Sequence, residues 1–123
     1  MTRTRIRLVS ALTMLLGLVM IGGGAVKVAG VPSQVVAFTG WGLPGWFRAL
    51  VGTFEVLGGI LLIVSATRPA GSLILSTIMV GALWAHAANG EWSHLVPVAI
   101  LLSLLLTIFR VNRPQALRLL GAQ

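Results

Sequence analysis

The stretch VGTFEVLGGILLI, residues 51–63, places a single glutamate, Glu55, in an otherwise apolar run. The chain of 123 residues has only two acidic side chains, is 57% hydrophobic and has a mean hydropathy of +1.00. Charged residues make up 9% of the sequence, whereas soluble domains contain roughly 25%. This composition is typical of an integral membrane protein. We therefore expect Glu55 to lie within a span, where an ionised carboxylate needs a partner.

Four apolar segments predict four spanning helices. They cover approximately residues 8–29, 48–66, 70–88 and 95–110. Each is long enough to cross about 30 Å of hydrocarbon at roughly 1.5 Å per residue, with the fourth at the lower limit. The runs are continuous rather than alternating, which argues against strands. We predict an all-α integral membrane protein: a four-helix transmembrane bundle forming one domain over residues 1–123.

The longest connection, GVPSQVVAFTGWGLPGW at residues 30–46, lies between the first two spans. A proline and a serine at its start and a glycine at its end predict a short interfacial helix over residues 33–39. The rest is expected to form a loop over the outer mouth of the bundle. The basic, apolar N-terminus is similar to a signal peptide. Its apolar run is too long and no small-residue cleavage site follows, so we expect it to be retained.

The distribution of charge predicts the topology. With both termini in the cytoplasm, seven of the nine basic residues lie inside, and only Lys27 and Arg48 lie outside. The formal charge of +7 sits in the termini and one short turn, as topology-setting charges do, so we expect no nucleic-acid binding. The expected surroundings are a lipid bilayer.

Helical spacing indicates where Glu55 points. Arg48, Gly52, Glu55 and Gly59 recur at i, i+4, i+7 and i+11 and therefore share one narrow face. Small residues mark close helix contacts in membranes, so this face is expected to point into the bundle and not into lipid.

Similar stripes of small or polar residues occur on the other spans, and we expect all of them to face one shared axis. They are Thr13, Gly17, Met20, Gly24 and Lys27 on the first span, Ser72, Ser76, Met79, Leu83 and His86 on the third, and Ala99, Ser103 and Thr107 on the fourth. The resulting hypothesis is a cluster of Lys27, Arg48, Glu55 and His86 near the outer face.

The sequence leaves two interpretations of this cluster open. In one, the charged groups only hold helices together or reach the headgroup layer. In the other, Glu55 and His86 handle protons or bind a ligand. The sequence has no cysteine and only two histidines, His86 and His94, so we expect no zinc or other metal site, and haem is disfavoured.

The sequence resembles the DoxX-like family of small membrane proteins over nearly its whole length. The resemblance rests on Lys27 closing the first span, the GLP turn at residues 42–44, Glu55 followed by two glycines, and MVGALWAH at residues 79–86. It implies a four-helix bundle in the bacterial cytoplasmic (inner) membrane and partners in redox or oxidative-stress functions.

No cofactor motif is present, but the resemblance makes a quinone the most plausible ligand. Glu55 and His86 would then handle protons, and Trp41, Trp46 or Trp84 would pack against the ring. The first functional hypothesis is thus a quinone-binding or accessory subunit of a membrane oxidoreductase, which predicts an apolar cavity touching Glu55. Whether the chain is itself an enzyme stays open.

Two alternatives belong to other functional classes. The first is a non-catalytic assembly protein that docks another membrane subunit or a second copy of itself, which predicts an exposed stripe of small residues and no cavity. The second is a small proton-coupled transporter or lipid-binding protein. The sequence has no inverted repeat that would support transport.

Overall fold

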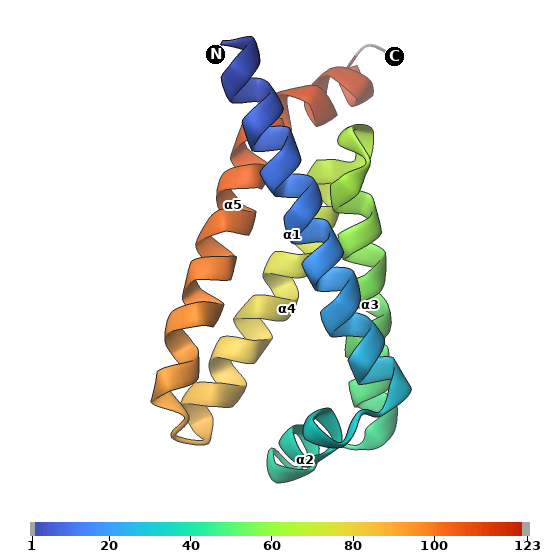
Figure 1. The fold of residues 1–123 in the computed structure, drawn as a ribbon, viewed down its shortest axis with the longest axis vertical. Helices are drawn as coiled ribbons and strands as arrows, with labels where there is room; N and C mark the ends of the chain where they lie inside the picture. Colours follow the sequence, from blue (N-terminus) through green and yellow to red (C-terminus); the bar gives the residue numbers. More distant parts are fainter. Residues whose placement is uncertain (1, 122–123) are drawn as a thin grey trace.

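The computed structural model describes the backbone of residues 2–121 and the side chains of residues 2–112. Helices follow one another along this part of the chain (Figure 1). Their bounds are α1 (Arg3–Ala29), α2 (Pro32–Gly40), α3 (Gly45–Ile63), the 3₁₀ turn η1 (Ser65–Thr67), α4 (Arg68–Ala88) and α5 (Trp92–Gly121). Four of these helices are long and apolar enough to span a membrane, and the described backbone contains no strand. The expected all-α, four-span fold class is confirmed.

Each spanning helix begins a few residues before the apolar segment that predicted it. α1, for example, starts at Arg3 and not at residue 8. Its start is set by Thr2, whose side-chain oxygen accepts a hydrogen bond from the Arg5 backbone N–H at 3.2 Å. Apolar length measures the part of a helix that lies in hydrocarbon, whereas capping groups set the helix ends.

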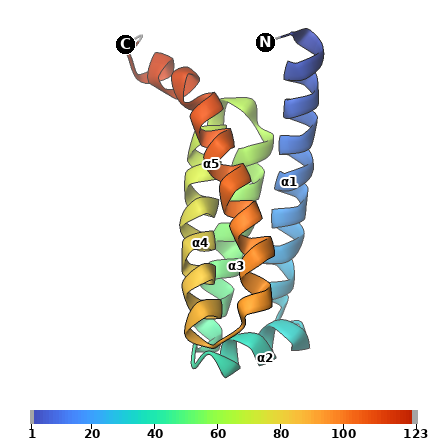
Figure 2. The same ribbon diagram turned by 90° about the vertical axis from the view of Figure 1, so that its left-hand side faces the viewer.

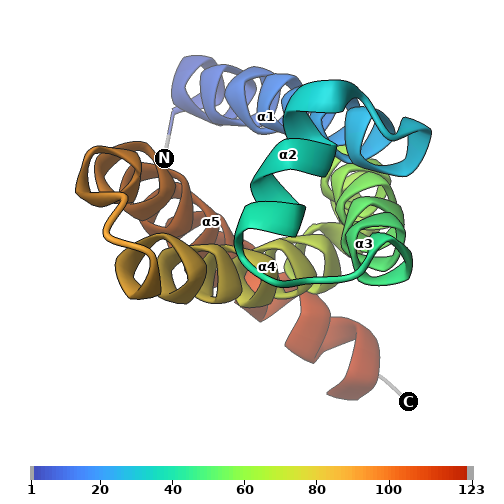
Figure 3. The ribbon, with the colours of Figure 1, turned by 90° about the horizontal axis from the view of Figure 1, so that it is seen from below.

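The connection between the first two spans contains a helix, as the sequence predicts. Gly30 ends α1 in the left-handed conformation, with φ of 72°, and α2 follows from Pro32. α2 lies across one end of the bundle (Figure 3), which we call the α2 end. The opposite end holds the start of α1, the turn η1 and the last part of α5 (Figures 1 and 2), and we call it the arginine end.

The spanning helices pack in series. α1 lies along α3, α3 packs against α4, and α4 packs against α5. A cluster of buried large side chains joins all four: Met20, Leu62, Leu75, Met79 and Leu105. α5 is therefore at the edge of the series, with α4 as its main neighbour.

The predicted inward faces of α1, α3 and α4 are confirmed. Thr13 and Met20 are buried on α1, Glu55 is buried on α3, and Ser72 and Met79 are buried on α4. The small or polar stripe of each of these helices is the side on which its neighbours approach.

The prediction for the fourth span was wrong. Ala99, Ser103 and Thr107 are exposed, whereas Leu105 of the same helix is fully buried against α4. The large side chains of α5 fill the space beside α4, so its small-residue stripe faces away from the bundle.

Glycines set the distance between α1 and α3. A Cβ atom added at Gly24 would lie 2.5 Å from the carbonyl oxygen of Gly52, and one added at Gly17 would lie 2.8 Å from that of Gly59. These contacts are to backbone, which cannot move aside as a flexible side chain can. The two glycines of each helix are seven residues apart. The antiparallel helices α1 and α3 therefore come into backbone contact twice along one line, which we call the seam.

Gly24→Ala is expected to lower the melting temperature in detergent. The added methyl group must push the two backbones apart, and overpacking of this kind typically costs about 1–3 kcal/mol. Gly22→Ala is the matched control, because a Cβ at Gly22 meets nothing within 4 Å. Equal melting temperatures for the two variants would show that the seam does not limit stability.

Candidate functional site

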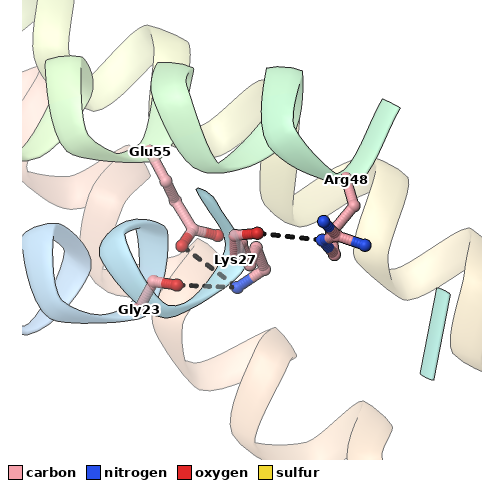
Figure 4. Close-up of polar contacts among 4 residues, drawn as sticks. All are labelled: Gly23, Lys27, Arg48 and Glu55. Carbon is pink, nitrogen blue, oxygen red and sulfur yellow. Dashed lines mark hydrogen bonds and ion pairs between the residues drawn. The ribbon is translucent and has the colours of Figure 1, made fainter. Parts of the chain in front are cut away.

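Glu55 lies on the buried face of α3 and is only 3% exposed. Its Oε2 is 3.1 Å from the Nζ of Lys27, near the end of α1 (Figure 4). Of the four residues that were predicted to cluster, these two form an ion pair. Burying one of these charges alone would cost several kcal/mol, so each provides the counter-ion that the other needs.

Gly23 makes room for this ion pair. A Cβ at Gly23 would lie 3.1 Å from the Glu55 carboxylate oxygen. The Gly23 carbonyl also accepts a hydrogen bond from the Lys27 ammonium at 3.4 Å (Figure 4). The ammonium therefore bridges its own helix and α3, and the close α1–α3 approach brings the two side chains within reach.

Arg48 also lies at the contact between α1 and α3, but it does not contact the Glu55 carboxylate. Its Nε donates a hydrogen bond to the backbone carbonyl of Lys27 at 2.9 Å (Figure 4). That carbonyl belongs to the last turn of α1, where the helix dipole is negative and a cation is stabilising. Arg48 therefore acts as a cap for α1 that is supplied by α3.

His86 does not join this group, which corrects the predicted four-residue cluster. Its Nδ1 lies 3.0 Å from Oε1 of Glu91 in the turn between α4 and α5. The indole N–H of Trp41, just after α2, donates to the same oxygen at 2.8 Å. We call Trp41, His86 and Glu91 the latch, because they fasten the α2 segment to the α4–α5 turn.

Aromatic rings pack within the latch and beside it. The rings of Trp41 and His86 meet edge to face at 5.1 Å, and His94 stacks on His86 with centroids 5.0 Å apart. Phe38 of α2 is buried beside Trp41. Trp41, one of the three tryptophans suggested as ring-packing residues, thus packs against Phe38 and His86.

Trp46 and Trp84, the other aromatic candidates, are 70% and 72% exposed. Neither lies against Glu55 in the buried interior. Exposed tryptophans near the ends of spanning helices are typical of residues in the headgroup layer.

Two residues with specific polar contacts, Glu91 and Arg68, were not predicted from the sequence. Glu91 was given no role, although it is one of only two acidic side chains in the chain. Arg68 was counted as a topology-setting charge, yet it is only 8% exposed. The small number of carboxylates in the sequence could have indicated a specific role for Glu91. Nothing in the sequence indicated that Arg68 turns inward.

The pKa of Glu91 is lowered from its ordinary value of 4.5. The largest cause is the hydrogen bond from the Trp41 indole, followed by the bond with His86. Both favour the ionised carboxylate. The latch therefore keeps Glu91 ionised to a lower pH than an ordinary glutamate.

Two hollows open on the lipid-facing surface. One, of about 430 Å³, is lined by the exposed face of α5, and the other, of about 370 Å³, lies between α3 and α4. Neither is lined by Glu55 or Lys27. Within residues 2–112, no three His, Asp or Glu side chains come close enough together to hold a metal ion.

The fold and the buried ion pair define the class: a multi-pass helical membrane protein whose spans pack as one bundle, with a lysine–glutamate pair buried between α1 and α3. The chain belongs to the DoxX-like family, whose model matches residues 11–108. It is also similar to the uncharacterized protein YdgD of Bacillus subtilis (strain 168), with 29% identity over 98 residues, covering 76% of this chain and 85% of that protein. No solved structure matches the chain significantly.

Lys27→Met is expected to destabilise the protein by about 3 kcal/mol, because it leaves Glu55 buried without a counter-ion. The double variant Lys27→Met/Glu55→Gln should recover at least half of that loss, since no unpaired charge remains. Melting temperatures in detergent of Lys27→Met, Glu55→Gln and the double variant give the coupling energy between the two side chains. Additive losses would mean that the pair does not interact.

Acidification is expected to open the latch. Because the folded pKa of Glu91 is depressed, its contribution to stability is present above pH 4.5 and is lost as pH falls through the lower folded value. The fluorescence of Trp41, isolated by subtracting the spectrum of Trp41→Phe, should therefore change below pH 4.5. In Glu91→Gln the same change should be absent. A transition that persists in this variant would assign it to another group.

Proposed function

We propose that the chain is a bacterial cytoplasmic-membrane protein with both termini in the cytoplasm. The arrangement of charge supports this topology, because seven of the nine basic residues belong to segments at the arginine end. Lys27 and Arg48 belong to the α2 end. Positive charge collects on the cytoplasmic side of helical membrane proteins.

We further propose that the protein is a non-catalytic interaction subunit that binds a transmembrane helix of another membrane protein along α5. The observation that carries this proposal is the outward stripe of Ala99, Ser103 and Thr107. Both hydroxyls donate to carbonyls within α5, Ser103 to Ala99 at 2.9 Å and Thr107 to Ser103 at 2.8 Å. The stripe therefore presents no unpaired polar group to an approaching helix.

The lipid-facing side of α1 provides a comparison within the same chain. It exposes large side chains: Leu12, Leu15, Leu18 and Val19. Contact with lipid does not require small residues, whereas close contact with a helix favours them. Small residues lie where α1 meets α3 and where α3 meets α4. α5 carries small residues, flanked by large ones, on a face that none of the described helices covers.

A quinone-linked function, which the family resemblance implies, is the second candidate. It is favoured by one buried group: the Ser76 hydroxyl has no hydrogen-bond partner among the described residues. Such a hydroxyl is free to bond a carbonyl oxygen of a ligand. Against this candidate, the hollows described above are not lined by Glu55 or Ser76.

Cross-linking in the native membrane tests the first proposal. A photoreactive residue at Val96, which lines the α5 hollow, is expected to cross-link to a different membrane chain. Ser103→Leu should reduce the yield about tenfold, because the leucine fills the centre of the contact.

Thr77→Leu is the matched control for this experiment. The Thr77 hydroxyl is also exposed and also donates to a backbone carbonyl of its own helix. Thr77, however, lines the hollow between α3 and α4. Equal losses in the two variants, or cross-links only to a second copy of the chain, would contradict the proposal. A stoichiometric quinone that copurifies with the protein and is lost in Glu55→Gln would favour the second candidate instead.

A further inference from the structure

Arg68, the first residue of α4, is a buried cation at the arginine end. Its Nε donates to the Leu62 carbonyl at 3.0 Å, and its Nη2 donates to the Ser10 hydroxyl at 3.0 Å and to the Ile63 carbonyl at 3.4 Å. These bonds hold the guanidinium between α1, the end of α3 and the start of α4. Its position is thus fixed by three segments of the chain.

No acidic side chain of the chain neutralises Arg68. The sequence has two, and both are engaged elsewhere: Glu55 with Lys27, and Glu91 with His86 and Trp41 at the opposite end. Carbonyl and hydroxyl oxygens satisfy hydrogen bonds but supply no negative charge. Burying a cation without a counter-ion is costly, so an external anion at this position would be stabilising.

Further positive charge surrounds this position. Arg3 and Arg7 precede Ser10 by seven and three residues, so they lie on the same side of α1 as the hydroxyl that contacts Arg68. α4 also begins here without a side-chain cap, which leaves the positive end of its dipole toward the same region.

We propose that this group, with Arg68 at its centre and Arg7 beside it, binds the phosphate of an anionic phospholipid. Nε and Nη2 of Arg68 are engaged within the chain, which leaves its Nη1 to donate to a phosphate oxygen. Hydrogen bonds between a guanidinium and a phosphate are charge-assisted, and basic pockets between spanning helices are suited to anionic headgroups. The site lies at the first residue of α4, at one end of a helix that is long enough to span a membrane, and we expect that end at the level of the lipid phosphates. A lipid therefore fits better than a soluble phosphate. The site is separate from the α5 face, so either proposal can fail without the other.

The test compares two variants with the same change in charge. Arg7→Gln removes a cation from the Arg68 side of α1, whereas Arg5→Gln removes one from the opposite side, two residues away. The affinity of purified protein for phosphatidylglycerol is measured by native mass spectrometry, with phosphatidylcholine as the reference lipid. Arg7→Gln is expected to weaken the preference for phosphatidylglycerol at least about fivefold, and Arg5→Gln by less than about twofold.

Three results would overturn the proposal. Equal losses in the two variants would indicate diffuse attraction to a charged surface. Displacement of the lipid by glycerol phosphate at similar concentrations would indicate a site for a soluble phosphate. Wild-type lipid preference in a folded Arg68→Gln variant, which removes both the charge and the guanidinium, would exclude Arg68 from binding. If that variant does not fold, the comparison of Arg7 with Arg5 decides.

Discussion

The close approach of α1 and α3 is the constraint on which the rest of the structure depends. The two helices meet backbone to backbone at Gly24 and Gly52 and again at Gly17 and Gly59. Without a strong hydrophobic force between helices in lipid, such contacts rely on close van der Waals packing. The same approach brings Lys27 within reach of Glu55 and lets Arg48 cap the end of α1. The close approach of α1 and α3 therefore produces both the tight helix packing and the neutralisation of the Glu55 charge by Lys27.

Much of this seam could be predicted from the sequence, because helical spacing fixes which residues share a face. The stripe of Arg48, Gly52, Glu55 and Gly59 placed Glu55 inward. The positions of Lys27, Arg48 and His86 near the outer helix ends made all three of them candidate partners. Spacing says nothing about turns, however. His86 was assigned to the wrong carboxylate because Glu91 reaches it from a turn whose path is set by tertiary contacts.

The two other departures have different physical causes. The small stripe of α5 was expected to face inward, as on the other helices, but the rotation of a helix is decided by what packs best, and Leu105 took the inward position. Arg68 was expected at the surface because long basic side chains usually extend to the headgroups. Ser10 and the carbonyls at the end of α3 offered it bonds inside. Such partners become visible only once the segments are assembled.

The latch has a consequence for biogenesis. Trp41 and Glu91 are 50 residues apart, so their bond closes a long loop that includes all of α3 and α4. The α1–α3 seam needs only the first half of the chain and can form while the second half is still being synthesised. The Trp41–Glu91 bond can form only once the turn between α4 and α5 has been made. α2 is therefore fixed across the bundle at a later step than the α1–α3 contact, when the α4–α5 hairpin is added.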